Sequence, residues 1–117
     1  MKKNYVGIDI SKDDFVVAYW SKDEIIKTIN YQNSSKGINK FIKTLDQNFW
    51  CVMEATGIYH LALALSLAKK EIAVSVVNPL KIKRFAQTKL SRTKTDKADA
   101  KLIAEYGYRM NPKLYCP

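Results

Sequence analysis

The order in which β-rich and helical runs follow one another constrains the fold of this 117-residue chain more than any single motif does. Three β-rich runs come first, at residues 5–10, 15–20 and 25–31, and only short polar gaps separate them. Gaps this short are typical of turns between antiparallel strands. The first part of the chain is therefore predicted to form an antiparallel meander of three strands.

Helical and β-rich runs then alternate. The clearest amphipathic helix follows Ser34 and Ser35, because apolar residues recur there at the spacing of one helix face and either serine suits the cap. A second helix is apolar nearly all round, so it is predicted to be well covered. The expected segments are a helix from about residue 35, a strand at 49–54, a helix at 57–70, a strand at 72–77, a short basic helix at 80–88, a loop at 89–95 and a final helix from 96 to about 109.

With the short basic helix at 80–88 left out, this order is βββαβαβα, which predicts an α/β fold with a mixed five-stranded sheet and helices on both faces. Strands that are separated by helices favour parallel pairing with right-handed crossovers, so the fourth and fifth strands are expected to run parallel to the first. Residues 1–110 are predicted to form this domain. The tail, residues 111–117, is expected to contain no closing element and to lead into a further domain outside this chain.

Length and composition are those of one globular domain. Hydrophobic residues make up 47% of the chain, which excludes a disordered protein. The longest apolar-rich run, residues 58–68, contains a histidine and a serine and is too short to span a bilayer. No signal peptide is visible, and the two cysteines, Cys51 and Cys116, have no metal-site spacing. A reduced, cytoplasmic location with no membrane partner is therefore expected.

Positive charge is concentrated in one segment of the chain. The net charge is +9, and residues 80–101 carry eight basic residues against two acidic ones, a net charge of +6. Such a segment is the electrostatic footprint expected for binding a phosphate backbone, although a solvated lysine-rich face has the same composition. Charge alone does not separate DNA from RNA. The predicted nucleic-acid-binding residues are Lys12, Lys81, Lys83, Arg84, Lys89, Arg92, Lys94 and Lys97.

Two carboxylates occupy unusual places in the predicted sheet. Asp9 lies inside the apolar first strand, where an aspartate disfavours β structure and is unfavourable to desolvate. Glu54 ends the fourth strand, just before a turn. If the first and fourth strands are parallel neighbours, both side chains lie near the carboxyl ends of their strands, where open α/β sheets form their sites. The alternatives are an aspartate satisfied by backbone N–H groups and a glutamate that faces water.

Two more carboxylates, Asp96 and Asp99, begin the predicted final helix. If this helix starts near Asp96, then Asp99 falls on the same apolar stripe as Leu102, Ile103 and Tyr106. A charge on that stripe costs free energy unless something compensates it. Asp99 is then expected to point into the carboxyl edge of the sheet, with Asp96 at the rim. The alternative is a capping role, with Asp96 as the N-cap and Asp99 three positions later.

Four gathered carboxylates repel one another and stay partly protonated unless cations compensate them. A pair of hard divalent ions such as Mg²⁺, with Mn²⁺ as a substitute, prefers carboxylate and water oxygens and clamps the reacting oxygens in phosphoryl transfer. Asp9, Glu54, Asp96 and Asp99 are therefore predicted to be both metal ligands and catalytic residues. The nearby lysines would hold a polyanionic substrate.

Three segments of the chain, taken together, resemble a known family. "YVGIDISKDDFVVAYW", "VMEATGIYH" and "VVNPLKIKRFAQTKLSRTKTDKADAKLIAEY" are similar to the three motif blocks of the DEDD insertion-sequence transposases, the group that includes the Piv-type site-specific DNA invertases. The resemblance extends from residue 5 to about residue 108, with the three blocks in the same order and at suitable spacing. The last block is the most specific of the three.

The resemblance implies a ribonuclease H-like fold, similar to that of the RuvC Holliday-junction resolvase, in agreement with the order of elements. It also implies a Mg²⁺-dependent site for DNA strand cleavage and strand transfer. The acidic residues of that site fall on Asp9, Glu54, Asp96 and Asp99 by motif. The aspartates at positions 13–14 do not match the family's acidic positions and are predicted to be turn residues.

Full-length members of the family are longer than this chain. They continue with a helical segment and a carboxyl-terminal domain that adds a serine to the active site. The resemblance also implies a structured guide RNA as a partner, a homo-oligomeric full-length protein and a place at the nucleoid of a bacterial or archaeal cytoplasm. This chain is therefore expected to carry the acidic half of a composite site.

Several functions fit these features. The leading one is the catalytic domain of a DNA transposase or recombinase. A nucleic-acid-binding module with structural carboxylates, or a Holliday-junction-type nuclease domain of the same fold, fits the same charge pattern. A phosphotransferase of the actin-like ATPase group shares the core fold, but here Ser11 and Lys12 follow the first strand and no second glycine-rich loop appears.

Overall fold

The three amino-terminal strands form the meander that their short connections predict. They are β1 (Asn4–Ile10), β2 (Asp14–Ser21) and β3 (Glu24–Gln32), and β2 pairs antiparallel with both of its neighbours. The computed structural model describes residues 4–21, 24–55, 57–88 and 99–115.

A hydrogen-bonded turn joins β1 to β2. The Ser11 hydroxyl donates to the Asp14 carboxylate at 2.7 Å, and the Ser11 N–H donates to the Asp14 carbonyl oxygen at 2.9 Å. Side chains of this type commonly close turns by bonding to nearby backbone. The predicted turn position is confirmed for Asp13, which lies between the two strands, whereas Asp14 begins β2 and bonds to Ser11 from there.

The two later strands extend the sheet on the other side of β1. β4 (Phe49–Glu54) pairs parallel with β1, and β5 (Ala73–Val77) pairs parallel with β4. The order across the five-stranded sheet is β3-β2-β1-β4-β5, which places β1 at the centre. A central strand is buried on both faces and reads as a nearly continuous apolar run, as β1 does. The predicted mixed sheet is confirmed.

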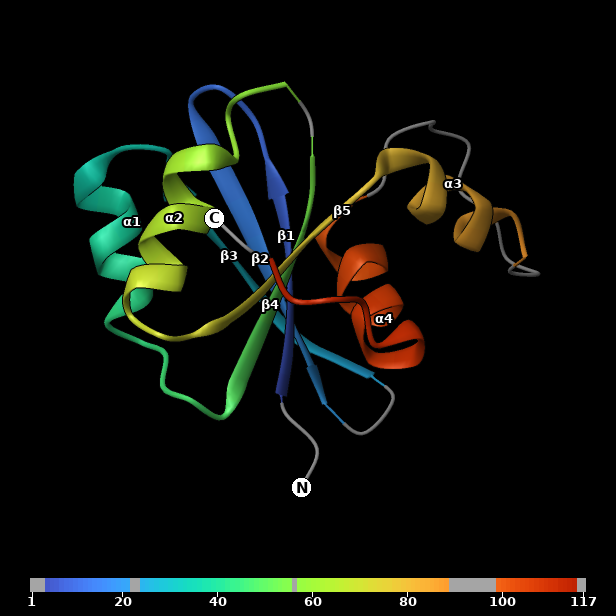
Figure 1. The fold of residues 1–117 in the computed structure, drawn as a ribbon. Helices are drawn as coiled ribbons and strands as arrows, with labels where there is room; N and C mark the ends of the chain where they lie inside the picture. The colour runs from blue at the N-terminus through green and yellow to red at the C-terminus, as the bar shows by residue number, and fades with distance from the viewer. Residues whose placement is uncertain (1–3, 22–23, 56, 89–98, 116–117) are drawn as a thin grey trace.

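Helices cover both faces of the sheet, as predicted. α1 (Ser35–Ile42) and α2 (Leu61–Lys69) lie on one side, and α3 (Pro79–Gln87) and α4 (Ala100–Met110) lie on the other (Figure 1). The Ser34 hydroxyl accepts a hydrogen bond from the Gly37 N–H, so the predicted cap of α1 is present. Among the described helices, none is both long and apolar enough to cross a membrane.

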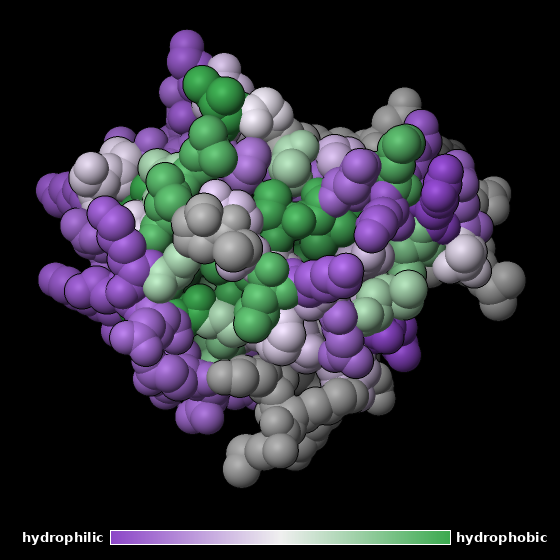
Figure 2. Space-filling model, in the orientation of Figure 1, coloured by the Kyte–Doolittle hydropathy of each residue, from purple (hydrophilic) through white to green (hydrophobic). Residues whose placement is uncertain are grey.

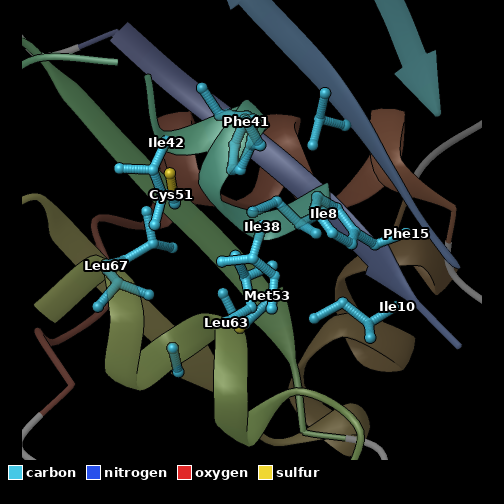
Figure 3. Close-up of a cluster of buried hydrophobic side chains, with 14 of the residues drawn as sticks. Ile8, Ile10, Phe15, Ile38, Phe41, Ile42, Cys51, Met53, Leu63 and Leu67 are labelled. Carbon is cyan, nitrogen blue, oxygen red and sulfur yellow. The ribbon is translucent and has the colours of Figure 1, made fainter. Parts of the chain in front are cut away.

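The larger hydrophobic core fills the space between the sheet and the α1–α2 layer. Val6, Ile8 and Ile10 alternate along β1 and point into it, and they meet Phe41 from α1 and Leu67 from α2. Figure 3 shows how the side chains from the strands and both helices converge. Full burial of a side chain of this size stabilises the fold by about 1.5–3 kcal/mol. This layer therefore contributes much of the stability of the domain.

A second core lies on the opposite face, under α4. Tyr5 and Val52 point into it because successive strand residues face opposite sides of a sheet. They meet Ile103 and Tyr106 from α4 and Ile82 from α3. α3 thus joins the domain through one buried residue, while most of its surface stays exposed.

α2 is shorter and less covered than its composition predicts. It begins at Leu61 instead of residue 57, and the residues before it form a turn. Leu63 is fully buried, but Leu61 is 41% exposed and Leu65 is 40% exposed. Figure 2 shows hydrophobic side chains at the surface in this region. The prediction of a well-covered helix is wrong, because only one side of α2 packs on the sheet.

The chain after α4 is tied to the sheet. The Ser75 hydroxyl donates to the Pro112 carbonyl oxygen at 3.3 Å, and the Tyr115 N–H donates to the Val74 carbonyl oxygen at 2.7 Å. Tyr115 also packs against the larger core. Residues 111–115 form no helix or strand, but these contacts join them to the edge strand β5.

Candidate active site

Two glycines bring α4 directly onto the centre of the sheet. A Cβ atom on Gly7 would lie 2.2 Å from the Ala100 carbonyl oxygen and 2.2 Å from the Ala104 nitrogen, so only glycine lets the helix backbone approach β1 this closely. Near the other end of the helix, a Cβ atom on Gly107 would lie 2.6 Å from Val52 Cγ2. The position of α4 on β1 and β4 is therefore fixed at both ends.

The direction of α4 follows from its contacts with β1. Its first residue, Ala100, rests on Gly7, whereas Asn111, just past its last residue, accepts a hydrogen bond of 2.7 Å from the Tyr5 hydroxyl. The helix therefore runs antiparallel to β1. Its amino terminus, which carries a partial positive charge, points toward the carboxyl ends of β1 and β4.

Asp9 and Glu54 lie side by side at this end of the sheet. Ile8 is level with Met53 in the parallel ladder, so the next pair along is Asp9 and Glu54. Neighbouring strands are about 4.8 Å apart, which brings the two carboxylates within reach of a common ion. Both residues are half-buried, and they face the α4 side because Ile8 and Met53 point into the opposite core. The parallel pairing that this arrangement requires is confirmed.

Asp99 caps α4. Its backbone is extended, with φ −94° and ψ 174°, and its carboxylate accepts a hydrogen bond of 2.9 Å from the Leu102 N–H. The helix therefore begins at Ala100 and not near Asp96, and the exposed Asp99 precedes the buried stripe instead of belonging to it. Both the predicted stripe position and the alternative third helical position are wrong for Asp99. Aspartate is a favoured N-cap, because its carboxylate accepts a hydrogen bond from a backbone N–H group of the first turn, and the helix therefore starts one residue after Asp99.

Part of the predicted site lies outside the described residues. This holds for one carboxylate and for four of the predicted basic residues, namely Asp96, Lys89, Arg92, Lys94 and Lys97.

The remaining predicted basic residues are exposed near the carboxyl ends of the parallel strands. Lys12 lies two residues after the end of β1. Lys81, Lys83 and Arg84 lie on α3, which starts two residues after the end of β5. These cations therefore lie at the same end of the sheet as the paired carboxylates, namely the carboxyl ends of the parallel strands.

Asn33 is a positioning residue that the sequence did not indicate. Its side-chain amide donates to the Ser11 carbonyl oxygen at 2.9 Å and to the Tyr59 carbonyl oxygen at 3.1 Å. It thereby joins the turn after β1 to the turn before α2. An asparagine after a strand is common in turns, so no sequence signal marks it as a link between two loops.

The donors at this edge suit a hard divalent cation. Asp9 and Glu54 offer carboxylate oxygens, the type of ligand that Mg²⁺ and Mn²⁺ prefer. In residues 4–21, 24–55, 57–88 and 99–115, no group of three or more His, Cys, Asp or Glu side chains is gathered closely enough to hold a metal ion. The described part of the chain thus supplies a pair of adjacent carboxylates, with the Asp99 cap at the same end of the sheet.

Comparison with known families decides what kind of domain this is. The model of the DEDD transposase family, described as a transposase, matches residues 6–115. The chain belongs to the DEDD transposase family. The match extends from within β1 through α4.

This transposase domain has relatives among curated proteins. It is 34% identical over 123 residues to the pilin gene-inverting protein of Moraxella bovis and 34% identical over 123 residues to that of Moraxella lacunata. Each alignment covers 100% of this chain and 38% of the relative. The chain therefore spans about two fifths of the length of the curated relatives it matches.

Solved structures show the same fold. RuvC of Thermus thermophilus, in complex with a Holliday junction substrate, superposes with a TM-score of 0.63 and covers 97% of this chain and 99% of that chain. A second structure of Thermus thermophilus RuvC gives a TM-score of 0.60. Sequence identity is 11% in both cases, so the likeness concerns the fold. The predicted RuvC-like, ribonuclease H-like architecture is confirmed.

Proposed function

We propose that this chain is the catalytic domain of a DNA recombinase of the transposase type, which cleaves DNA strands and transfers them with the help of divalent metal ions. The observation that carries the proposal is the pair of carboxylates, Asp9 and Glu54, at the carboxyl ends of the two central parallel strands. Membership in a transposase family gives this acidic pair its functional context.

In this proposal, Mg²⁺, or Mn²⁺ in its place, is held by Asp9 and Glu54 together with Asp96 and Asp99. When bound, the metal stabilises the charge on the attacking and leaving oxygens of phosphoryl transfer. The protein contributes a rigid support for its ligands, since Asp9 is on the central strand and Asp99 is fixed by its bond to the Leu102 N–H. A support of this kind keeps catalytic groups in position.

The basic residues would bind the polyanionic substrate that the carboxylates repel. Lys12 follows β1, and the cations of α3 follow β5. They therefore lie at the carboxyl ends of the parallel strands, where the proposed metal site also lies. Contacts from such residues to phosphates release counterions and make binding salt-dependent. Their role here is to hold the DNA backbone over the carboxylates.

The complete protein would need more than this domain. We propose that residues 1–110 supply the acidic half of a composite site and that a carboxyl-terminal domain supplies the rest. DNA, a structured guide RNA and further copies of the protein are the proposed partners, and the nucleoid of a bacterial or archaeal cytoplasm is the proposed location. The curated relatives, of which this chain matches 38%, leave room for such a domain.

A metal titration tests the acidic pair directly. We expect Mn²⁺ to raise the melting temperature of this chain, because a ligand present at about 100 times its Kd stabilises the folded state by about 2.7 kcal/mol. The rise should be lost in a variant that combines Asp9→Asn with Glu54→Gln, which removes both charges and changes the side-chain volumes little.

The matched control is Asp46→Asn, at the opposite end of β4. Asp46 is exposed, and its carboxylate accepts a hydrogen bond from the Asn48 N–H that an asparagine can also accept. This control should keep the full response to Mn²⁺. In the full-length recombinase, Asp9→Asn should abolish strand cleavage while the protein stays folded. Retained cleavage would contradict the proposed metal site.

A second candidate function is a nucleic-acid-binding module with purely structural carboxylates. Two observations favour it. The Asp99 carboxylate already has a structural role as the N-cap of α4. Among the described residues, no three His, Cys, Asp or Glu side chains are gathered closely enough to hold a metal ion. This module would bind nucleic acid with a strong salt dependence. It predicts no stabilisation by Mn²⁺ at any concentration, so the same titration separates the two functions.

A further inference from the structure

A groove lies between α3 and α4, and the chain that follows α4 also lines it. Its volume is about 1040 Å³, at the upper limit of about 1,000 Å³ that is usual for small-molecule sites. Six of its lining residues matter for binding, namely Lys81, Arg84, Phe85, Tyr106, Arg109 and Lys113.

The charged side chains that line this groove in the described part of the chain are all basic. Lys81 and Arg84 lie one turn apart on α3 and are exposed, and Lys113 faces them from the chain after α4. Within the described ranges, the lining contains no aspartate or glutamate. Several cations gathered along one groove favour a polyanion as the occupant.

The floor of the groove is apolar and aromatic. Phe85 from α3 is half-buried and packs edge to face on Tyr106 from α4, with ring centroids 5.4 Å apart. Tyr106 belongs to the second core and is only 6% exposed, so it supports Phe85 from below. Met110, beside them, is 55% exposed. Figure 2 shows hydrophobic surface next to hydrophilic side chains over α3 and α4. Aromatic side chains beside cations form the type of surface on which unpaired bases stack.

Arg109 is a fixed member of this set. Its Nε donates to the Glu105 carboxylate at 2.8 Å, and its guanidinium lies 5.9 Å from the centre of the Trp20 ring and 5.8 Å from that of Tyr108. Contacts of this kind hold an arginine in one orientation. Because Arg109 also serves these internal contacts, its substitution is unsuitable as a test of binding.

The groove begins beside the proposed metal site. Val77 lines the groove and is level with Glu54 in the ladder between β5 and β4. A chain that leaves the groove at this end therefore passes one strand away from the Glu54 carboxylate. This geometry links the groove to the acidic edge of the sheet.

We propose that the α3–α4 groove binds a single strand of nucleic acid, with phosphates on Lys81, Arg84 and Lys113 and an unpaired base against Phe85. This inference rests on the proposed function and names the path of the strand that approaches the carboxylates. A duplex hides its base faces and would leave the aromatic floor unused. A small anion would need the cations but not the floor.

Fluorescence anisotropy with labelled single-stranded DNA, single-stranded RNA and duplex DNA of equal length tests the groove. The test variant combines Lys81→Gln, Arg84→Gln and Lys113→Gln. The loss of three phosphate contacts should reduce the slope of log K against log salt concentration by about two for a single strand. This corresponds to about a hundredfold weaker binding at 0.1 M salt. Whichever single strand binds more tightly identifies the natural type of strand.

A matched control on the opposite layer removes the same charge. Lys36→Gln, Lys40→Gln and Lys43→Gln change three exposed lysines in and just after α1. This control should bind nearly as tightly as the unmodified chain. An equal loss in both variants would overturn the proposal, because net charge alone would then account for binding.

Phe85→Leu tests the stacking surface, since leucine keeps the apolar contact but has no aromatic face. We expect binding of a single strand to weaken about fivefold or more, and binding of duplex DNA to stay unchanged. An equal effect on both would overturn the role of the floor. All binding is measured without divalent ions, and each variant is checked for an unchanged melting temperature.

The proposed groove and the proposed metal site can be refuted independently of each other. The triple groove variant should keep its stabilisation by Mn²⁺, and Asp9→Asn should keep single-strand binding in the absence of metal. If the unmodified chain binds single strands but is not stabilised by Mn²⁺, the metal site alone is refuted. Tight binding of single strands by the groove variant alone refutes the groove.

Discussion

The Asp99 carboxylate stands at the amino terminus of α4, one residue before the backbone that rests on Gly7. Its hydrogen bond to the Leu102 N–H satisfies one of the free donors at the start of the helix. This bond uses one of the two carboxylate oxygens. A structural role as a cap is therefore compatible with the proposed role as a metal ligand, and the two roles respond differently to substitution.

Two substitutions at Asp99 separate these roles. Asp99→Ala should lower the free energy of unfolding by about 1 kcal/mol, because alanine does not cap the helix. Asp99→Asn should leave stability nearly unchanged, because the amide oxygen accepts the same hydrogen bond, but it should weaken the response to Mn²⁺. Chemical denaturation and the metal titration measure the two effects.

Either role at Asp99 can be refuted alone. Equal destabilisation by the alanine and asparagine variants would contradict the cap. An unchanged Mn²⁺ response in the asparagine variant would exclude Asp99 from the metal site.

At the scale of elements, α4 depends on close contact with β1. The backbone of the helix crosses Gly7 with no room for a side chain, so the start of α4 lies next to the carboxylates on the strand ends. The sequence marks Gly7 only as a glycine inside a strand, which is compatible with several explanations. The close approach is a property of the packed fold and is invisible in the periodicity of either element.

Gly7→Ala should strongly destabilise the domain. The added Cβ atom would lie 2.2 Å from backbone atoms of Ala100 and Ala104, which cannot move without shifting the helix. We expect a loss of about 3 kcal/mol, at the upper end for overpacked cores. Chemical denaturation measures it.

Gly107→Ala is the comparison for this variant. Its new Cβ atom would meet the side chain of Val52 at 2.6 Å, and a side chain yields more easily than backbone. A smaller loss is therefore expected at Gly107. A tolerated Gly7→Ala substitution would contradict the described position of α4.

α2 shows the opposite relation between sequence and structure. Its composition is apolar on all sides, which predicts burial, yet Leu61 and Leu65 remain exposed while Leu63 and Leu67 are buried. Composition tells how much apolar surface a helix offers. It does not tell how many neighbours the fold supplies to cover that surface.

At the scale of the whole molecule, the chain after α4 completes the domain. Asn111 bonds to Tyr5, Pro112 to Ser75 and Tyr115 to Val74, so the chain joins the central strand and the edge strand. The boundary at residue 110 expected from the sequence therefore cuts through contacts that stabilise the sheet.

A chain that ends at Met110 should be less stable than one that ends at Tyr115. Three hydrogen bonds to the sheet are lost, each contributing about 1 kcal/mol, so we expect a loss of about 3 kcal/mol. Thermal and chemical unfolding measure the difference. Removal of residues 116–117 alone is the control and should have little effect. Equal stability of the two shortened chains would show that the contacts after α4 are unimportant.

The sequence by itself determined the order of elements, the parallel pairing of the central strands and the family. Short polar gaps, apolar periodicity and motif order are local properties, so they can be read along the chain. The same reasoning placed Asp9 and Glu54 at strand ends, since a charge in an apolar strand needs a partner.

Only the tertiary structure decided where α4 begins, which faces stay uncovered and how the chain after α4 ends. The start of α4 depends on whether Asp96 or Asp99 takes the first free N–H groups, and both are suitable caps by sequence. The α3–α4 groove likewise joins Lys81 and Lys113, which are distant in the chain. Such features arise from contacts between distant segments, and local patterns do not encode them.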